Sequence, residues 1–539
     1  MKTVFIIEDD SEFSKIIKET SNNTVYKPYG KNWEQFISFL YDNIEKITGK
    51  QMEYIIPSLL YWNKHYPKGR TTRYSSLIAL KFYEEKEQMS YHVYKKIKQD
   101  LLSIILLGAN EIKKGLEEVL EKVISNNWKK RMDPYYDLSI RILSSTSGHI
   151  CEVMPKLILK LAKTFWICNE ELDYYRSSDA ELFLIDENTT FNYHYASAFE
   201  TPILLLLTVD SKSTIDFILD FVNVSIENCA KNTFDNDRYN YYKPNIIELN
   251  IDNKKVTQYI SNSLWQCYRG TSSPIMPKLL ETIHMALERF LLTECDKGNF
   301  EYVGKIMKHI LSNSKSASLT SVVNSITLAF PDKFFDIALI LFKTIELFIY
   351  DTNRSLRERE TNTLYGLASH ITERYMVNER LNTINQKFRK NNLESLLLRY
   401  QLFSEEEIDD ETFKQRLYSI QNVIDQHKKE LKSKKSTKDE IDNYRILLSR
   451  NDCRNLSLKT EEKDNQILIT FENNNLDEDL KELSDNSFKA FENYFRYADL
   501  SLWADAKLKH EKLDENQIKY EYDLKLVLDR FKGLIDDLN

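Results

Sequence analysis

The sequence predicts an all-α fold, an α-solenoid-like array of helix pairs with one or two small β-hairpin insertions. Glycine supplies 11 of the 539 residues and proline 10, about 4% together against a usual ~12%. Sheet-rich folds need these residues at tight turns, because glycine permits positive φ and proline fixes φ. Apolar residues also recur at three- and four-residue intervals, the period of an amphipathic helix. No repeat period of 34 or ~40 residues accompanies the pattern, so the repeat prediction concerns architecture only.

The first half of the chain has helical spacing with short interruptions. A polar and aromatic break at 186–196 precedes a very apolar helix at 201–221. Before this break, the same spacing predicts helices at 31–62, 74–84, 100–128 and 135–168, and Gly108 interrupts the third of them.

One segment near 246–260 has the period of a β-strand. Ile247, Leu249 and Ile251 alternate with polar residues, and the dipeptide at 252–253 is Asp-Asn. This pattern predicts a two-residue hairpin. Because a lone hairpin is marginally stable in water, we expect it to pack against helices.

Helices resume after the hairpin. Ser273 suits an N-cap and Pro274 the first helical position, so a helix with one continuous apolar face is expected from there to Leu292. A second hairpin is possible at 455–471. Further helices are predicted at 300–313, 317–330, 333–350, 362–388, 391–403, 410–433, 437–449, 486–510 and 515–537.

Charge divides the chain. Residues 404–539 contain 23 Lys and Arg against 32 Asp and Glu, whereas the remainder is nearly balanced. We therefore predict a helical lead-in at 1–50, the helical-repeat array at 51–403 and an acidic helical domain at 404–539. A general nucleic-acid surface needs clustered Lys and Arg, so no nucleic-acid partner is predicted.

The cysteine pattern and the hydropathy predict a cytoplasmic protein. The six cysteines are scattered, with no C-x-x-C pair, as in reduced and mostly buried thiols. No run reaches the ~18 apolar residues of a membrane span, and the N-terminus lacks a signal-peptide core. No membrane partner is therefore predicted.

No motif nominates a catalytic, cofactor-binding or metal-binding residue. No two glycines lie five apart, as a P-loop requires, and no G-x-G-x-x-G occurs. H-x-x-x-H, H-E-x-x-H and Cys/His clusters are also lacking. His284, inside an apolar helix, is interpreted as a hydrogen-bonded packing residue. No cofactor is expected, and we lean against an enzyme.

Aromatic residues in the polar loop before the hairpin are candidate contact residues. Tyr239, Tyr241 and Tyr242 stand near charged residues, a combination typical of protein-contact hot spots. The alternative is that the loop tucks its rings onto the array.

Four segments, taken in order, resemble the helical region that follows the ATPase module in large bacterial STAND-type NTPases, several of which act in antiphage defence. The resemblance covers roughly residues 50–403, and its motifs are short and largely structural. The segments are Pro67–Arg73 with Leu77–Tyr83, Asp133–Leu143, Leu264–Gly270 with the helix around Met285–Glu288, and Ser312–Pro331.

This resemblance implies that the helical region recognises a trigger or holds the ATPase inactive. The ATPase module itself is missing, so ATP binding does not carry over. Arg73, Trp265, Tyr268 and Arg269 match motif positions and are candidate interface residues. The alternative is that Trp265 packs in the core and Arg269 caps or bridges carbonyls.

We therefore expect a non-catalytic sensor or scaffold region of a STAND-like signalling or antiphage system. Its protein partners would include a separate ATPase module or a phage-derived trigger. One alternative is a stand-alone helical adaptor without a defence role. Another is an enzyme with a site assembled from residues distant in sequence, which perturbed pKa values in a polar pocket would favour.

Overall fold

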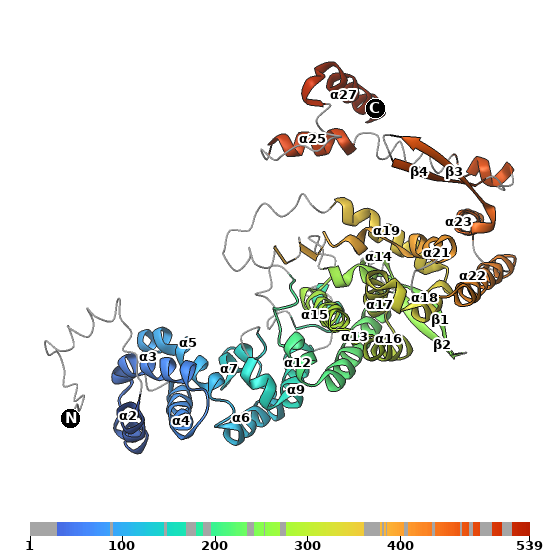
Figure 1. The fold of residues 1–539 in the computed structure, drawn as a ribbon. Coiled ribbons are helices and arrows are strands. Elements are labelled where there is room, and N and C mark those ends of the chain that lie inside the picture. The colour runs from blue at the N-terminus through green and yellow to red at the C-terminus, as the bar shows by residue number, and fades with distance from the viewer. Residues whose placement is uncertain are drawn as a thin grey trace. The chain divides into compact units, whose positions relative to one another are not determined.

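The fold is described from a computed structural model, which confirms a mostly α-helical class with small β insertions (Figure 1). The residues that the structure describes are 30–86, 90–144, 148–168, 179–186, 196–233, 242–252, 254–269, 276–360, 378–379, 382–383, 385–403, 408–433, 437–463, 466–473, 478–483, 485, 498–508 and 520–538.

The chain divides into two compact units. Unit 1 contains Met1–Ile246, Val256–Ile326 and His370–Arg380, and unit 2 contains Ile247–Lys255, Thr327–Ser369 and Leu381–Asn539. The predicted boundaries at 50 and 404 stay predictions.

The N-terminal helices of unit 1 pack on one another. Helices α3 (Gly49–His65) and α4 (Arg70–Glu84) both contact α5 (Tyr91–Leu107), and α4 also contacts α2 (Lys31–Asp42) (Figure 1). The single helix predicted at 31–62 is wrong, because Thr48 begins a new helix with a capping box in which its backbone N–H donates to Gln51 Oε1 at 2.9 Å. The elements are α2 (Lys31–Asp42), η1 (Ile44–Lys46), α3 (Gly49–His65), α4 (Arg70–Glu84), α5 (Tyr91–Leu107) and α6 (Lys113–Ser125).

The helix predicted at 100–128 is divided at Gly108, the predicted interruption, where α5 ends. A Cβ at Gly108 would lie 1.8 Å from Ser76 Oγ, so only glycine lets α4 approach this turn. The Asn63 amide joins the contact, donating to Ser76 Oγ at 2.9 Å and to the Ile104 carbonyl at 3.1 Å. This cluster ties α3, α4 and α5 together.

The middle of unit 1 contains shorter helices than predicted. Pro155 starts α9 within the range predicted as one helix at 135–168, as its fixed φ favours. Helix α12 (Ile203–Val209) ends at Asp210. The Asp210 carboxylate accepts a hydrogen bond from the Ser213 N–H at 3.1 Å, in the first turn of α13 (Ser211–Thr233). The elements are α7 (Tyr136–Ile142), α8 (Gly148–Val153), α9 (Pro155–Trp166), α10 (Asp179–Leu182), α12 (Ile203–Val209) and α13 (Ser211–Thr233).

The predicted hairpin is confirmed. Strands β1 (Asn245–Ile251) and β2 (Lys254–Ile260) form a two-stranded sheet. Ile247, Leu249 and Ile251 are buried, as their alternation predicts. The Tyr259 N–H donates to the Lys315 carbonyl at 2.8 Å, which joins β2 to the start of α17 (Ala317–Ala329).

The helix predicted from Ser273 begins later, at Lys278, with Pro277 as its N-cap. Ser273 and Pro274 lie outside the described residues. The remaining elements of unit 1 are α14 (Asn262–Trp265), η4 (Cys267–Arg269), α15 (Lys278–Asp296) and α16 (Phe300–Asn313).

Unit 2 contains helices and a second hairpin. Strand β3 (Leu456–Lys463) pairs antiparallel with β4 (Gln466–Asn473), which confirms the hairpin predicted at 455–471. The other elements are η5 (Pro331–Lys333), α18 (Phe335–Phe342), α19 (Glu346–Glu360), η7 (Lys387–Lys390), α21 (Leu393–Leu402), α22 (Asp410–Leu431), α23 (Lys438–Arg450), η8 (Cys453–Asn455), α25 (Ala498–Leu508) and α27 (Leu524–Leu538).

Among the helices described, none combines the length and the apolar character that a membrane crossing requires.

Candidate protein-contact site

The exposed start of α4 carries a cluster of aromatic and cationic side chains that we call the Tyr–Arg surface, defined as Tyr41, Arg70, Arg73 and Tyr74. The rings of Tyr41, from α2, and Tyr74 stack with centroids 4.4 Å apart. Arg70 Nε donates to the Tyr74 hydroxyl at 2.6 Å, and its guanidinium lies 5.2 Å from the ring centroid. Arg73, a predicted interface residue, is exposed and lies three residues after Arg70, about one turn further along α4.

The chain reaches this position through Gly69. Its φ of 116° lies in a region that other residues rarely adopt, and α4 starts at the next residue. The first turn of α4 therefore presents Arg70 and Arg73 directly after the bend.

The electrostatics of this turn are cationic. Lys68, Arg70 and Arg73 are exposed, and the first turn contains no acidic residue. The unpaired N–H groups of a helix start add positive potential. The surface therefore suits an acidic partner.

Two other predicted interface residues lie in the core. Trp265 in α14 and Tyr268 in η4 are 0% and 1% exposed. Neither side chain offers surface to a partner, which favours the packing alternative for Trp265 over the predicted interface role. The sequence contains no signal that separates the two, because tryptophan and tyrosine are frequent both in cores and at interfaces. Arg269 ends η4, and its side chain lies outside the described residues.

The predicted aromatic loop is described only at its end. Tyr239 and Tyr241 lie outside the described residues. Tyr242 is half-buried and packs edge-to-face on Phe183, with centroids 5.7 Å apart. For this ring the alternative of packing onto the array is the one observed.

His284 has the packing role that its apolar helix predicts. Its Nδ1 lies 2.7 Å from the Leu280 carbonyl and its Nε2 lies 2.8 Å from Ser318 Oγ. Burial lowers the pKa of His284 to about 4. Cys267 Sγ lies 3.6 Å from Nδ1, and burial raises the pKa of this thiol. A neutral imidazole beside a neutral thiol is a structural contact at physiological pH.

α15 is buried beyond the single apolar face that its sequence predicts. Glu281 and Glu288 are 1% and 3% exposed. Lys278 Nζ lies 2.8 Å from the Glu281 carboxylate, and the Ser325 hydroxyl donates to Glu288. Polar residues of α15 and α17 thus pair with each other in the core, which periodicity alone does not reveal.

One cluster joins residues distant in sequence. Ser197 donates to the Glu379 carboxylate, and Arg289 Nη1 lies 3.6 Å from Glu379 Oε1. Burial, and then the charge of Glu379, raise the pKa of Glu200 to about 7. The enzyme alternative would use such a carboxyl group. The sequence did not predict this cluster, because no local motif links residues that lie so far apart in the chain.

The raised pKa of Glu200 gives a pH-dependent prediction. Between about pH 4.5 and 7 the folded chain holds a proton that the unfolded chain releases, so its stability falls as pH rises through this window. Glu200→Gln removes the ionisation. We expect it to increase the unfolding free energy by about 1–2 kcal/mol at pH 8, a figure discounted for partial solvent exposure, and to change it little at pH 4.5. Urea denaturation at both pH values tests this, and an equal effect at both would contradict it.

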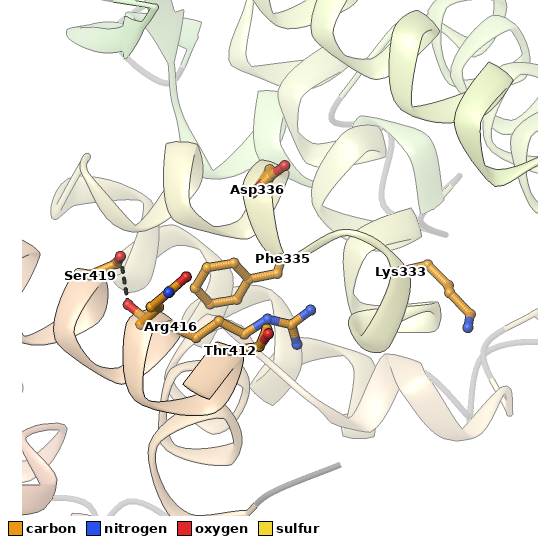
Figure 2. Close-up of a pocket in the computed structure, with 7 residues that line it drawn as sticks. Lys333, Phe335, Asp336, Thr412, Arg416 and Ser419 are labelled. Carbon is orange, nitrogen blue, oxygen red and sulfur yellow. Dashed lines mark hydrogen bonds between the residues drawn. The ribbon is translucent and has the colours of Figure 1, made fainter. Parts of the chain in front are cut away.

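Unit 2 contains a small open pocket of about 340 Å³ between α18 and α22 (Figure 2). The Arg416 guanidinium lies 4.8 Å from the centroid of the Phe335 ring. Tyr400 supports that ring edge-to-face at 5.1 Å. The lining residues are Lys333, Phe335, Asp336, Thr412, Gln415, Arg416 and Ser419.

Within the ranges that the structure describes, no three His, Cys, Asp or Glu residues form a group that could hold a metal ion. No protein-family model matches the chain, and no curated protein matches it. The resemblance to STAND-type NTPases therefore stays a prediction.

Proposed function

We propose that the chain is a non-catalytic sensor or scaffold region that binds a protein partner, in a STAND-like signalling or antiphage defence system. The Tyr–Arg surface carries the proposal. It combines the residue types that dominate binding energy at protein interfaces with a position at the start of the segment that resembles the family.

The geometry of the surface favours binding at low entropic cost. The stacked Tyr41 and Tyr74 rings support each other, and Arg70 is held by both the ring and the hydroxyl of Tyr74. Side chains that are ordered before binding lose less conformational entropy when a partner arrives. Arg73 beside them adds a charge that selects acidic surfaces and speeds encounter.

The experiment uses a photo-cross-linking amino acid in place of Arg73. Where a reading frame next to this gene encodes a P-loop ATPase, the full chain is co-expressed with that protein, irradiated, and analysed by mass spectrometry. We expect an adduct between position 73 and the ATPase module. In a pulldown of the same pair, Arg70→Glu with Arg73→Glu weakens binding by at least about tenfold, since two charges are reversed in the contact.

The matched control is Lys114→Glu, a charge reversal at an exposed position of α6. It should leave the ATPase bound. Binding that survives reversal of both arginines would refute the role of the Tyr–Arg surface. If no gene near this one encodes a P-loop protein, the proposed role in a STAND-like system is refuted. The alternative of a stand-alone helical adaptor then remains.

A further inference from the structure

α27 presents an apolar face to solvent. Leu524 is 72% exposed, Leu528 52%, Phe531 44% and Ile535 55%. These four residues define what we call the C-terminal stripe. Such a contiguous row of large apolar side chains is uncommon on a surface without a binding role.

A different face of α27 attaches it to its own chain. Val527 is buried in a cluster with Leu500 and Tyr520, and Leu526 and Trp503 pack against that cluster. The helix is therefore anchored through one face while the C-terminal stripe lies on another.

The spacing of the stripe is that of a coiled coil. Its members are separated by four, three and four residues, which are the steps of the a and d positions of a heptad. The steps read the same in both directions, so the stripe matches itself when a second helix runs antiparallel. Leu524 then lies opposite Ile535 of the second copy, and Leu528 opposite Phe531 of the second copy.

The flank of the stripe is compatible with self-pairing. Lys525, Asp529 and Lys532 are exposed beside it and alternate in sign. Two such flanks carry both charges and avoid the repulsion that two uniformly charged flanks would produce.

The area of the stripe sets the strength of the contact. Each of its side chains offers on the order of 100 Å², so two copies would bury roughly 800 Å² from the stripes alone, below the range of stable complexes. The expected association is therefore weak and concentration-dependent.

We propose that the C-terminal stripe binds a second copy of this chain as an antiparallel helix pair. The inference is independent of the Tyr–Arg surface, which lies in the other unit.

The test is sedimentation equilibrium of the full chain over a range of concentrations. We expect the wild-type mass to rise from 63.9 kDa towards twice that value. Leu528→Glu with Phe531→Glu should remain at the monomer mass with an unchanged circular dichroism spectrum. Tyr418→Glu, at an exposed aromatic residue of α22, is the matched control and should associate like the wild type.

Disulfide cross-linking tests the orientation. A mixture of the Leu524→Cys and Ile535→Cys chains should form a mixed dimer, whereas Leu524→Cys alone should form no more dimer than the oxidised wild type. Self-cross-linking of Leu524→Cys would show a parallel pair and overturn the proposal. It is also overturned if the wild type stays monomeric at hundreds of micromolar or if the double Glu variant still dimerises.

Discussion

Replacing Arg354 by alanine is expected to destabilise unit 2 by about 3–5 kcal/mol, because it leaves a buried charge without its partner. Arg354 and Asp351 are both 0% exposed. The Arg354 Nε donates to Asp351 Oδ1 at 2.7 Å, and its two terminal nitrogens donate to the carbonyls of Arg389 at 2.9 Å and Asn391 at 2.5 Å. The other Asp351 oxygen accepts from the Leu393 N–H at 2.8 Å.

Arg354 and Asp351, both in α19, form hydrogen bonds with backbone groups of residues 389–393, at and just before the start of α21. Loss of the ion pair therefore also weakens the contact between these two parts of the chain. Alanine removes the cation, so the buried Asp351 carboxylate loses its opposite charge and keeps the Leu393 N–H. The carbonyls of Arg389 and Asn391 also lose a hydrogen-bond donor. Lysine at the same position supplies a charge without the planar fork that reaches several acceptors, so Arg354→Lys should recover only part of the loss.

Hydrogen exchange of the α19 and α21 amides under increasing urea measures the effect. Arg445→Ala is the matched control, since Arg445 pairs with Asp442 at the same i,i+3 spacing while its side chain is 41% exposed. A solvated pair of this kind contributes at most about 1 kcal/mol. Equal losses for the two variants would contradict the structural role assigned to the buried pair.

The fold was predictable where local chemistry decides it. The alternation of Ile247, Leu249 and Ile251 predicts the hairpin, and the same residues are buried in β1. Helix ends were less predictable, because Thr48 and Asp210 interrupt apolar patterns that continue across them, whereas the break at Gly108 was predicted. At these positions capping and close packing outweigh periodicity.

The candidate contact site was predictable only in part. Arg73 was identified from its motif, whereas the stacking of Tyr41 on Tyr74 depends on the packing of α2 against α4. The α15 carboxylates and the Asp351–Arg354 pair are buried charges, and a charged residue in a helical pattern ordinarily predicts a solvated face. Their partners are selected by tertiary structure, which no local pattern contains.

Replacing Trp265 by alanine is expected to cost about 3–5 kcal/mol of stability in unit 1, the usual cost of removing a large aromatic ring from a core. The side chain is 0% exposed, in a segment with Leu264, Cys267 and Tyr268, which are also buried. Its removal leaves a cavity that the neighbouring helices fill only partly. Trp265→Phe retains most of the ring volume and should cost less.

This prediction separates the two roles that the sequence left open for Trp265. An interface residue would lose partner binding on substitution and leave the isolated chain as stable as the wild type, whereas a core residue lowers the unfolding free energy without any partner present. Arg73→Ala supplies the comparison from the same resemblance, since Arg73 is exposed and its loss should change stability by no more than about 0.5 kcal/mol. Urea denaturation of the two variants, followed through hydrogen exchange of α15, distinguishes the roles. If the Trp265→Ala chain is as stable as the wild type, the core role is wrong and the interface role of Trp265 is supported.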